Sequence, residues 1–227
     1  MRCISPMSIR SGKGYNTVPC GKCGPCLSNK RTEWTFRILE EYRLSLSGYF
    51  ITFTYDDEHL PENGLLRKKD LQDFHKRLRA SQDRTISRVG RSITGIPKSL
   101  REWKLGIRYY CVGEYGPTTG RGHYHGIYFN IHPRTLSDIK DLWGNGNIRI
   151  EPVNHGTVHY VTKYHVTAGS RDSYIKFLNE LEPEFTIMSL RPPIGYGYLE
   201  RAKQYHLDNL EFRVKFQDGH WANMPRY

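Results

Sequence analysis

Residues 49–55 constrain the fold more than any other part of this 227-residue chain. All seven are aromatic or β-branched, which is the composition of a buried β-strand. Gly48 precedes them, and the acidic residues 56–58 follow, so both ends of the strand are marked. We therefore expect a β-sheet that contains this strand.

Further segments predict a mixed α+β fold around it. Residues 107–113 and 123–129 read as two strands, and the Gly- and Pro-containing connection between them is typical of an antiparallel hairpin. Residues 148–153 read as a short strand. Apolar residues at helical spacing predict helices from residue 29 onward and over residues 71–78, 133–143 and 157–166. Residues 1–26, 81–101 and 190–227 show no clear period, and we expect an irregular arm, a loop and an irregular or partly stranded tail.

Charge suggests the class of partner. Lys and Arg number 34 against 23 Asp and Glu, a net charge of +11, and 16 tyrosines often stand beside basic residues. A basic surface with aromatic side chains suits single-stranded nucleic acid, although an evenly solvated basic surface is the alternative. We find neither an apolar run of membrane-spanning length nor a secretory signal, and therefore expect a soluble, intracellular protein.

His123 and His125 point to one face of the second hairpin strand, because side chains alternate along a strand. Glu114 lies near the end of the preceding strand, where pairing can bring its carboxylate opposite the histidines. Two imidazoles and a carboxylate suit Mg²⁺ or Mn²⁺ in phosphate chemistry, and also admit Zn²⁺. The alternative is a pair of histidines on a solvated strand surface. Asp56 or Asp57, after the first strand, competes with Glu114 as third ligand.

Tyr160, Lys163 and Tyr164 share one face of the helix expected over residues 157–166. A phenol can attack phosphorus, but its pKa near 10 makes the reactive oxyanion rare at neutral pH. A neighbouring cation and a metal would lower that barrier. The alternative is that both tyrosines only pack against the sheet.

Three of the five cysteines lie within seven residues and form two overlapping CxxC pairs. With a fourth thiol from Cys3, the set Cys3, Cys20, Cys23 and Cys26 predicts a structural Zn²⁺ site, and unligated thiols are the alternative. Cys111, in a predicted strand, is expected to be a small core residue.

These motifs, in this order, resemble the HUH endonucleases, and within them the replication initiators of microviruses of the gokushovirus branch. The matching blocks run from Cys3 to about His165. One departure is Gly122, where relatives often have proline before the first histidine. The blocks are residues 19–26, 49–55, 56–61, 113–116, 120–126 and 160–164.

The resemblance implies a central antiparallel sheet of the ferredoxin-like or RNA-recognition-like type, with helices on one face. It divides the chain into a Cys-rich arm with a zinc knot (1–28), a nuclease core (29–170) and a C-terminal extension (171–227). It implies metal ligation by His123, His125 and Glu114, alternating nucleophiles Tyr160 and Tyr164, and a Lys163 that steadies the phosphate or phenolate.

The function implied is initiation of rolling-circle replication in the cytoplasm of a host bacterium. A tyrosine would nick single-stranded origin DNA, giving a 5′-phosphotyrosine and a 3′-OH, and the circle would later be rejoined. Host helicase and polymerase are the implied partners. A transposase or relaxase, or a non-catalytic single-strand-binding module, are the rival interpretations. Candidate DNA contacts are Lys68, Lys69, Lys76, Arg77, Arg79 and Arg121.

Overall fold

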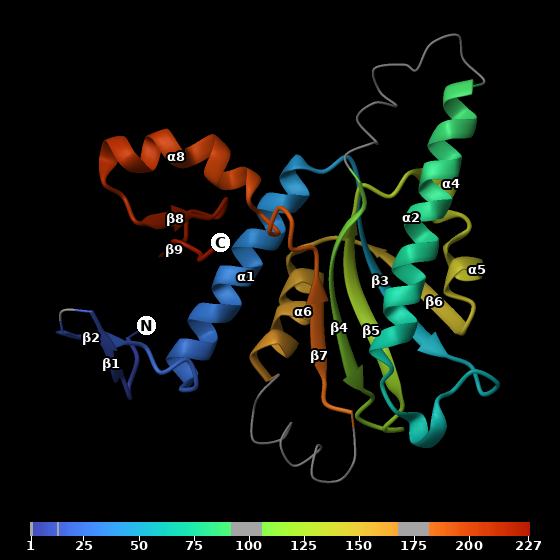
Figure 1. The fold of residues 1–227 in the computed structure, drawn as a ribbon, viewed down its shortest axis with the longest axis horizontal. Helices are drawn as coiled ribbons and strands as arrows, with labels where there is room; N and C mark the ends of the chain where they lie inside the picture. Colours follow the sequence, from blue (N-terminus) through green and yellow to red (C-terminus); the bar gives the residue numbers. More distant parts are fainter. Residues whose placement is uncertain (1, 13, 92–105, 168–181) are drawn as a thin grey trace.

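The centre of the protein is a five-stranded antiparallel sheet (Figure 1) with the strand order β6-β3-β5-β4-β7. The computed structural model describes residues 2–12, 14–91, 106–167 and 182–227, with side chains except at residues 90, 91 and 164–167. The strands are β3 (Gly48–Tyr55), β4 (Arg108–Tyr115), β5 (Gly122–Phe129), β6 (Gly146–Pro152) and β7 (Phe185–Met188). The expected antiparallel sheet and its first four strands are confirmed.

The strand β7 was not expected from the sequence. It pairs with the edge of β4, Tyr110 lying opposite Met188. The four residues of β7 are each only half-buried, so they carry no strong alternation of apolar and polar side chains. A segment assigned to the C-terminal extension therefore completes the central sheet.

Helices cover both faces of the sheet, which corrects the expectation that they lie on one. On one face, α1 (Gly24–Leu44) and α6 (His155–Thr167) bury apolar side chains against β3, β4 and β5. On the other face, α2 (Lys68–Arg91) packs beside two short helices, α4 (Pro133–Leu136) and α5 (Ile139–Trp143). The reason lies in the strands, since both sets of alternating positions in β3 and β5 are apolar enough to need cover.

Several helix boundaries differ from the expectation. The helix α1 begins at Gly24 rather than residue 29, and α2 continues to Arg91 through part of the predicted loop, whose remainder, 92–101, lies outside the described residues. The single helix expected from Pro133 is divided into α4 and α5. At the break, the Ser137 hydroxyl donates to the Arg134 carbonyl at 2.7 Å, a local bond that competes with helix continuation.

The two ends of the chain are also more ordered than expected. The arm contains an antiparallel hairpin of β1 (Met7–Ser11) and β2 (Gly14–Val18). The tail contains α8 (Gly197–Asn209), β8 (Arg213–Lys215) and β9 (Trp221–Asn223), and α8 and β9 contact α1. Most of these residues are exposed, so no buried face imposes a readable hydrophobic period. A 3₁₀ turn, Glu62–Gly64, follows β3. Among the described helices, none combines the length and apolar character needed to cross a membrane.

A buried phenol ties α2 to the sheet on the face opposite the histidines. The Tyr124 hydroxyl lies 2.7 Å from the Tyr55 hydroxyl, accepts from the Arg67 N–H at 2.8 Å and lies 3.0 Å from the Arg67 carbonyl. Burial raises the pKa of Tyr124 to about 12, so the hydroxyl stays protonated. Its partners have no access to water to replace it.

We predict that Tyr124→Phe lowers the free energy of unfolding by about 1–3 kcal/mol, because it leaves buried polar groups without their partner. Urea denaturation followed by circular dichroism measures this. Tyr15→Phe, at a residue that is 76% exposed, is the control and should change stability by less than about 0.5 kcal/mol. Equal stabilities of the two variants would contradict the assignment.

Candidate metal and tyrosine site

Strand pairing brings two histidines and a glutamate together. In the β4–β5 register Glu114 lies directly opposite His123, and alternation places His125 on the same face. The Glu114 Oε1 atom lies 2.9 Å from the Nε2 atom of each imidazole. One ligand atom from each residue thus lies within 4.8 Å of the others, and both Glu114 and His125 are buried.

The far nitrogens of both imidazoles are also held. His123 Nδ1 lies 3.3 Å from the Arg121 carbonyl, and because a carbonyl only accepts, this nitrogen carries the hydrogen. His125 Nδ1 lies 2.9 Å from the Thr52 hydroxyl. Such outer partners orient imidazoles and leave Nε2 as the ligand atom, as in many metal centres. The three residues form a group that fits a divalent cation.

The protonation of His123 reflects the same arrangement. Burial disfavours its charged form, but the hydrogen bonds to Glu114 and to the Arg121 carbonyl outweigh burial, and the pKa of His123 is raised. A buried carboxylate beside two imidazoles therefore attracts positive charge. A proton and a metal ion would compete for the same Nε2 lone pair.

Tyr160 reaches this group from α6. Its hydroxyl donates to Glu114 Oε1 at 2.7 Å and lies 3.4 Å from His125 Nε2. The phenol ring packs edge-on against the His125 imidazole, with ring centroids 4.8 Å apart, and against Phe50 behind it. The residue nevertheless remains 38% exposed. Tyr160 thus presents its hydroxyl on the histidine face of the sheet, at a position open to solvent.

The other two residues of the predicted helical face are described to different extents. Lys163 is exposed, one turn along α6 from Tyr160. The backbone of Tyr164 lies in α6, but its side chain is outside the described residues. The structure thus brings Tyr160 to the histidines and is silent on the Tyr164 phenol.

The two aspartates considered as third ligands point elsewhere. Asp56 accepts from the His59 backbone N–H at 2.9 Å and lies 2.7 Å from its ring Nδ1. The ion pair between Asp57 and Arg121 measures 2.8 Å. Within the described part of the chain, Glu114 is the carboxylate grouped with His123 and His125.

Five of the six candidate DNA contacts lie on α2, on the face opposite the histidines. Lys69 and Lys76 both pair with Asp73, and Arg77 donates to the carbonyls of Leu142 and Trp143. The remaining two α2 residues lie over aromatic rings, Lys68 near Phe185 and Arg79 near Tyr109. Only Arg121 is close to the histidine group, through its carbonyl bond to His123.

Sequence reasoning missed Thr52 and Phe50. Both lie in β3 on the same face as the histidines, and Thr52 is directly opposite His125 in the register. The Phe50 ring stacks on the His125 imidazole at a centroid distance of 5.6 Å. The alternation of β3 was readable, but its pairing with β5, which assigns these residues to the site, was not.

The cysteines form a second group. The sulfur atoms of Cys3, Cys20, Cys23 and Cys26 lie within 4.8 Å of one another. They belong to the N-terminal arm and the start of α1, away from β4 and β5 (Figure 1). Cys111 is fully buried in the sheet, as expected for a core residue.

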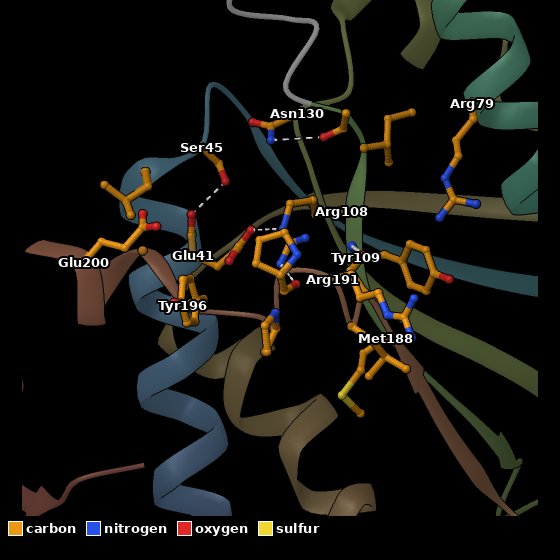
Figure 2. Close-up of a pocket in the computed structure, with 18 residues that line it drawn as sticks. Glu41, Ser45, Arg79, Arg108, Tyr109, Asn130, Met188, Arg191, Tyr196 and Glu200 are labelled. Atoms are coloured by element: carbon orange, nitrogen blue, oxygen red, sulfur yellow. Dashed lines mark hydrogen bonds and ion pairs between the residues drawn. The ribbon is translucent and has the colours of Figure 1, made fainter. Parts of the chain in front are cut away.

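A cavity of about 900 Å³ lies at the other end of β4 and does not include the histidines (Figure 2). Glu41 and Arg108 form an ion pair in its wall, and Arg108 also donates to the Pro192 carbonyl at 2.8 Å. Glu41 in turn accepts from the Gly195 N–H at 2.7 Å. These contacts fasten the C-terminal segment to α1 and β4, so we assign them a structural role.

Comparison with known proteins places the chain in a family. The family model for replication-associated proteins of the ORF2 type matches residues 48–168. Replication-associated protein VP4 of Bdellovibrio phage phiMH2K is 32% identical over 161 residues, and ORF4 of Chlamydia phage 1, also a replication-associated protein, is 25% identical over 187 residues. Replication-associated protein ORF2 of Spiroplasma virus 4 is 28% identical over 216 residues.

The matches cover 64%, 71% and 86% of this chain and 47%, 42% and 61% of those relatives, respectively, so it spans about half the length of the first two. No solved structure matches. The family model covers more than half of the 227 residues and includes β3, β4, β5 and α6, which carry the site. The chain therefore belongs to the ORF2-type family of replication-associated proteins.

Proposed function

We propose that this chain initiates rolling-circle replication by nicking single-stranded origin DNA with Tyr160 as the attacking nucleophile. The observation that carries the proposal is the convergence at Glu114, whose Oε1 atom meets the Tyr160 hydroxyl at 2.7 Å and both imidazole Nε2 atoms at 2.9 Å. A phosphate bound between these groups would be reached by the nucleophile and by a cation at once.

The chemistry requires a transesterification at phosphorus. The Tyr160 oxygen forms a bond to the phosphorus and loses its proton, for which Glu114 is the nearest acceptor shown. The bond from phosphorus to the 3′-oxygen of the preceding nucleotide breaks, and that oxygen takes up a proton. The products are a 5′-phosphotyrosine and a free 3′-OH, and no nucleotide cofactor is consumed.

A divalent cation suits the three ligands. We assign it to His123, His125 and Glu114, with Mg²⁺ or Mn²⁺ as the expected ion. When bound, it supplies Lewis-acid polarisation of the scissile phosphate and stabilises the charge that develops there. The chain's own contribution is to fix the ligand atoms, through the Arg121 carbonyl and the Thr52 hydroxyl on the far imidazole nitrogens.

Rejoining of the circle needs a second nucleophile or a reversal at the first. We assign this role to Tyr164, one helical turn after Tyr160, and assign Lys163 to steady the phosphate or the phenolate. This assignment rests on the order of residues in α6 and on the family's resemblance to two-tyrosine nucleases. The net charge of +11 favours a polyanionic substrate.

The cellular setting follows from the relatives. They are named as phage or virus replication-associated proteins. We therefore place the reaction in the cytoplasm of a host bacterium, with the free 3′-OH extended by a host polymerase and the duplex opened by a host helicase. Arg121, beside His123, is the basic residue best placed to contact the DNA backbone near the site.

We predict that Tyr160→Phe lowers formation of the covalent protein–DNA adduct by on the order of 10³-fold or more, because the attacking oxygen is removed. The measurement is a denaturing gel of the protein incubated with an origin oligonucleotide and Mn²⁺. Tyr164→Phe is the matched control and should still form the first adduct. The double variant should form none, while its affinity for the oligonucleotide stays nearly unchanged.

Other outcomes of the same experiment decide between functions. Undiminished adduct in the double variant would overturn the assignment of both tyrosines. Tight binding by the wild-type protein without cleavage in any metal would favour a single-strand-binding module. Transfer of the bound strand into a different DNA, rather than rejoining of the circle, would favour a transposase or relaxase.

We predict that the double variant His123→Ala and His125→Ala loses both nicking and Mn²⁺ binding, with affinity lowered by more than about 100-fold, because two of three ligands are removed. Calorimetric titration with Mn²⁺ measures the affinity. His59→Ala, at a residue whose side chain is 46% exposed, is the control and should retain wild-type affinity. Nicking by the double variant would place the metal elsewhere.

We predict that Thr52→Val weakens Mn²⁺ binding by about 10–100-fold with little loss of stability, because His125 loses the hydroxyl that orients its ring. Thr54→Val is a matched control on the same strand and the same face, since the Thr54 hydroxyl donates to the Asn147 carbonyl instead. Equal Mn²⁺ affinities of the two variants would show that the Thr52 contact does not position the ligand.

A further inference from the structure

The four thiols of the N-terminal arm have the separations of a metal centre. Cys3 and Cys23 have sulfur atoms 3.7 Å apart, and the sulfurs of Cys20 and Cys26 are 4.0 Å apart. Tetrahedral zinc with Zn–S bonds of about 2.3 Å places its sulfurs about 3.8 Å from one another. A disulfide would need about 2.0 Å, and all four cysteines are free thiols.

The backbone around the thiols is arranged to stabilise negative sulfur. The N–H groups of Lys22 and Cys23 both point at Cys20 Sγ, each at 3.4 Å. The N–H of Cys20 points at Cys3 Sγ at 3.3 Å. Gly21 makes this tight turn possible, since its φ of +72° is a conformation that side-chain-bearing residues rarely adopt. These donors are independent of the sulfur spacing and favour thiolates at the same place.

The arm has little else to hold it together. Every described residue of β1 and β2 is exposed except Val18, which is half-buried. A hairpin that buries no apolar face is marginal in water, and small units of this kind are commonly held by a metal or by disulfides. Cys26, in contrast, lies buried in the first turn of α1. The thiol cluster therefore joins a weakly packed arm to a well-packed helix.

We propose that Cys3, Cys20, Cys23 and Cys26 bind one structural Zn²⁺ ion as four thiolates, and that this ion fastens the arm to the start of α1. Binding replaces the four thiol protons, which are released, and involves no change of oxidation state. The site is closed, with four protein ligands and no position for substrate. It is chemically separate from the His123 group, whose nitrogen and oxygen ligands and open positions suit a harder, exchangeable ion.

Fastening the arm has a structural consequence for α6. Continuing from the thiols, α1 carries Arg31, whose guanidinium donates to the His159 carbonyl at 3.1 Å, next to Tyr160. One turn further, the Thr35 and Thr162 hydroxyls meet at 3.3 Å. The helix that begins at the thiol cluster is thus the helix that supports the tyrosine helix.

The test is the metal content of the full-length protein after dialysis in Mg²⁺ buffer, measured by mass spectrometry of the elements. We expect about one zinc per chain in the wild type. The same content is expected in the double variant His123→Ala and His125→Ala, and in Cys111→Ala, the matched control for loss of a cysteine. Cys23→Ser should lose the zinc. This readout is independent of nicking, so its failure would leave the proposed function untouched.

A second measurement avoids variants that fail to fold. The wild-type protein is stripped with a chelator and reloaded with Co²⁺, whose absorption reports four thiolate ligands in tetrahedral geometry. We expect that spectrum, and we expect proteolysis to release the arm only from the stripped protein. Iron with labile sulfide, disulfides among the four cysteines, or zinc that is retained in Cys23→Ser but lost from the histidine variant would each overturn the proposal.

Discussion

The register between β4 and β5 is the constraint on which the site depends. It sets Glu114 opposite His123, and alternation then adds His125 on the same face. A slip of one residue would send the ligands of one strand to the opposite face, among the packed side chains of α2. The buried residues on both sides of the sheet oppose such a slip, so the packing of the core also fixes the geometry of the metal ligands.

The second requirement is that α6 lie across the same face. Val158 and Val161 of α6 are fully buried in the cluster that contains Ile127 and Phe129 of β5. Between these valines along the helix, Tyr160 is left at the edge of the packed surface, with its hydroxyl on Glu114. Hydrophobic packing thus places the phenol, and the hydrogen bond to the carboxylate completes its orientation.

The sequence predicted those parts of the fold in which one face is buried and one period dominates. The strand at residues 49–55, the hairpin strands and the helices at 71–78 and 157–166 were confirmed because burial imposes their patterns. The arm hairpin, β7 and α8 were missed because their exposed or half-buried residues carry no such pattern. The grouping of His123, His125, Glu114 and Tyr160 was predicted from alternation and helical spacing, whereas the support from Thr52 required knowledge of which strands pair.

The central claim is that a single phenol, on the histidine face of the sheet, attacks the phosphorus. The most direct measurement is mass spectrometry of the peptide that remains joined to origin DNA after the first cleavage, trapped before rejoining and digested. The account predicts a phosphodiester on Tyr160, or on Tyr164 only when Tyr160 is absent. An adduct on a residue outside α6, or cleavage that yields no protein-linked DNA, would contradict it.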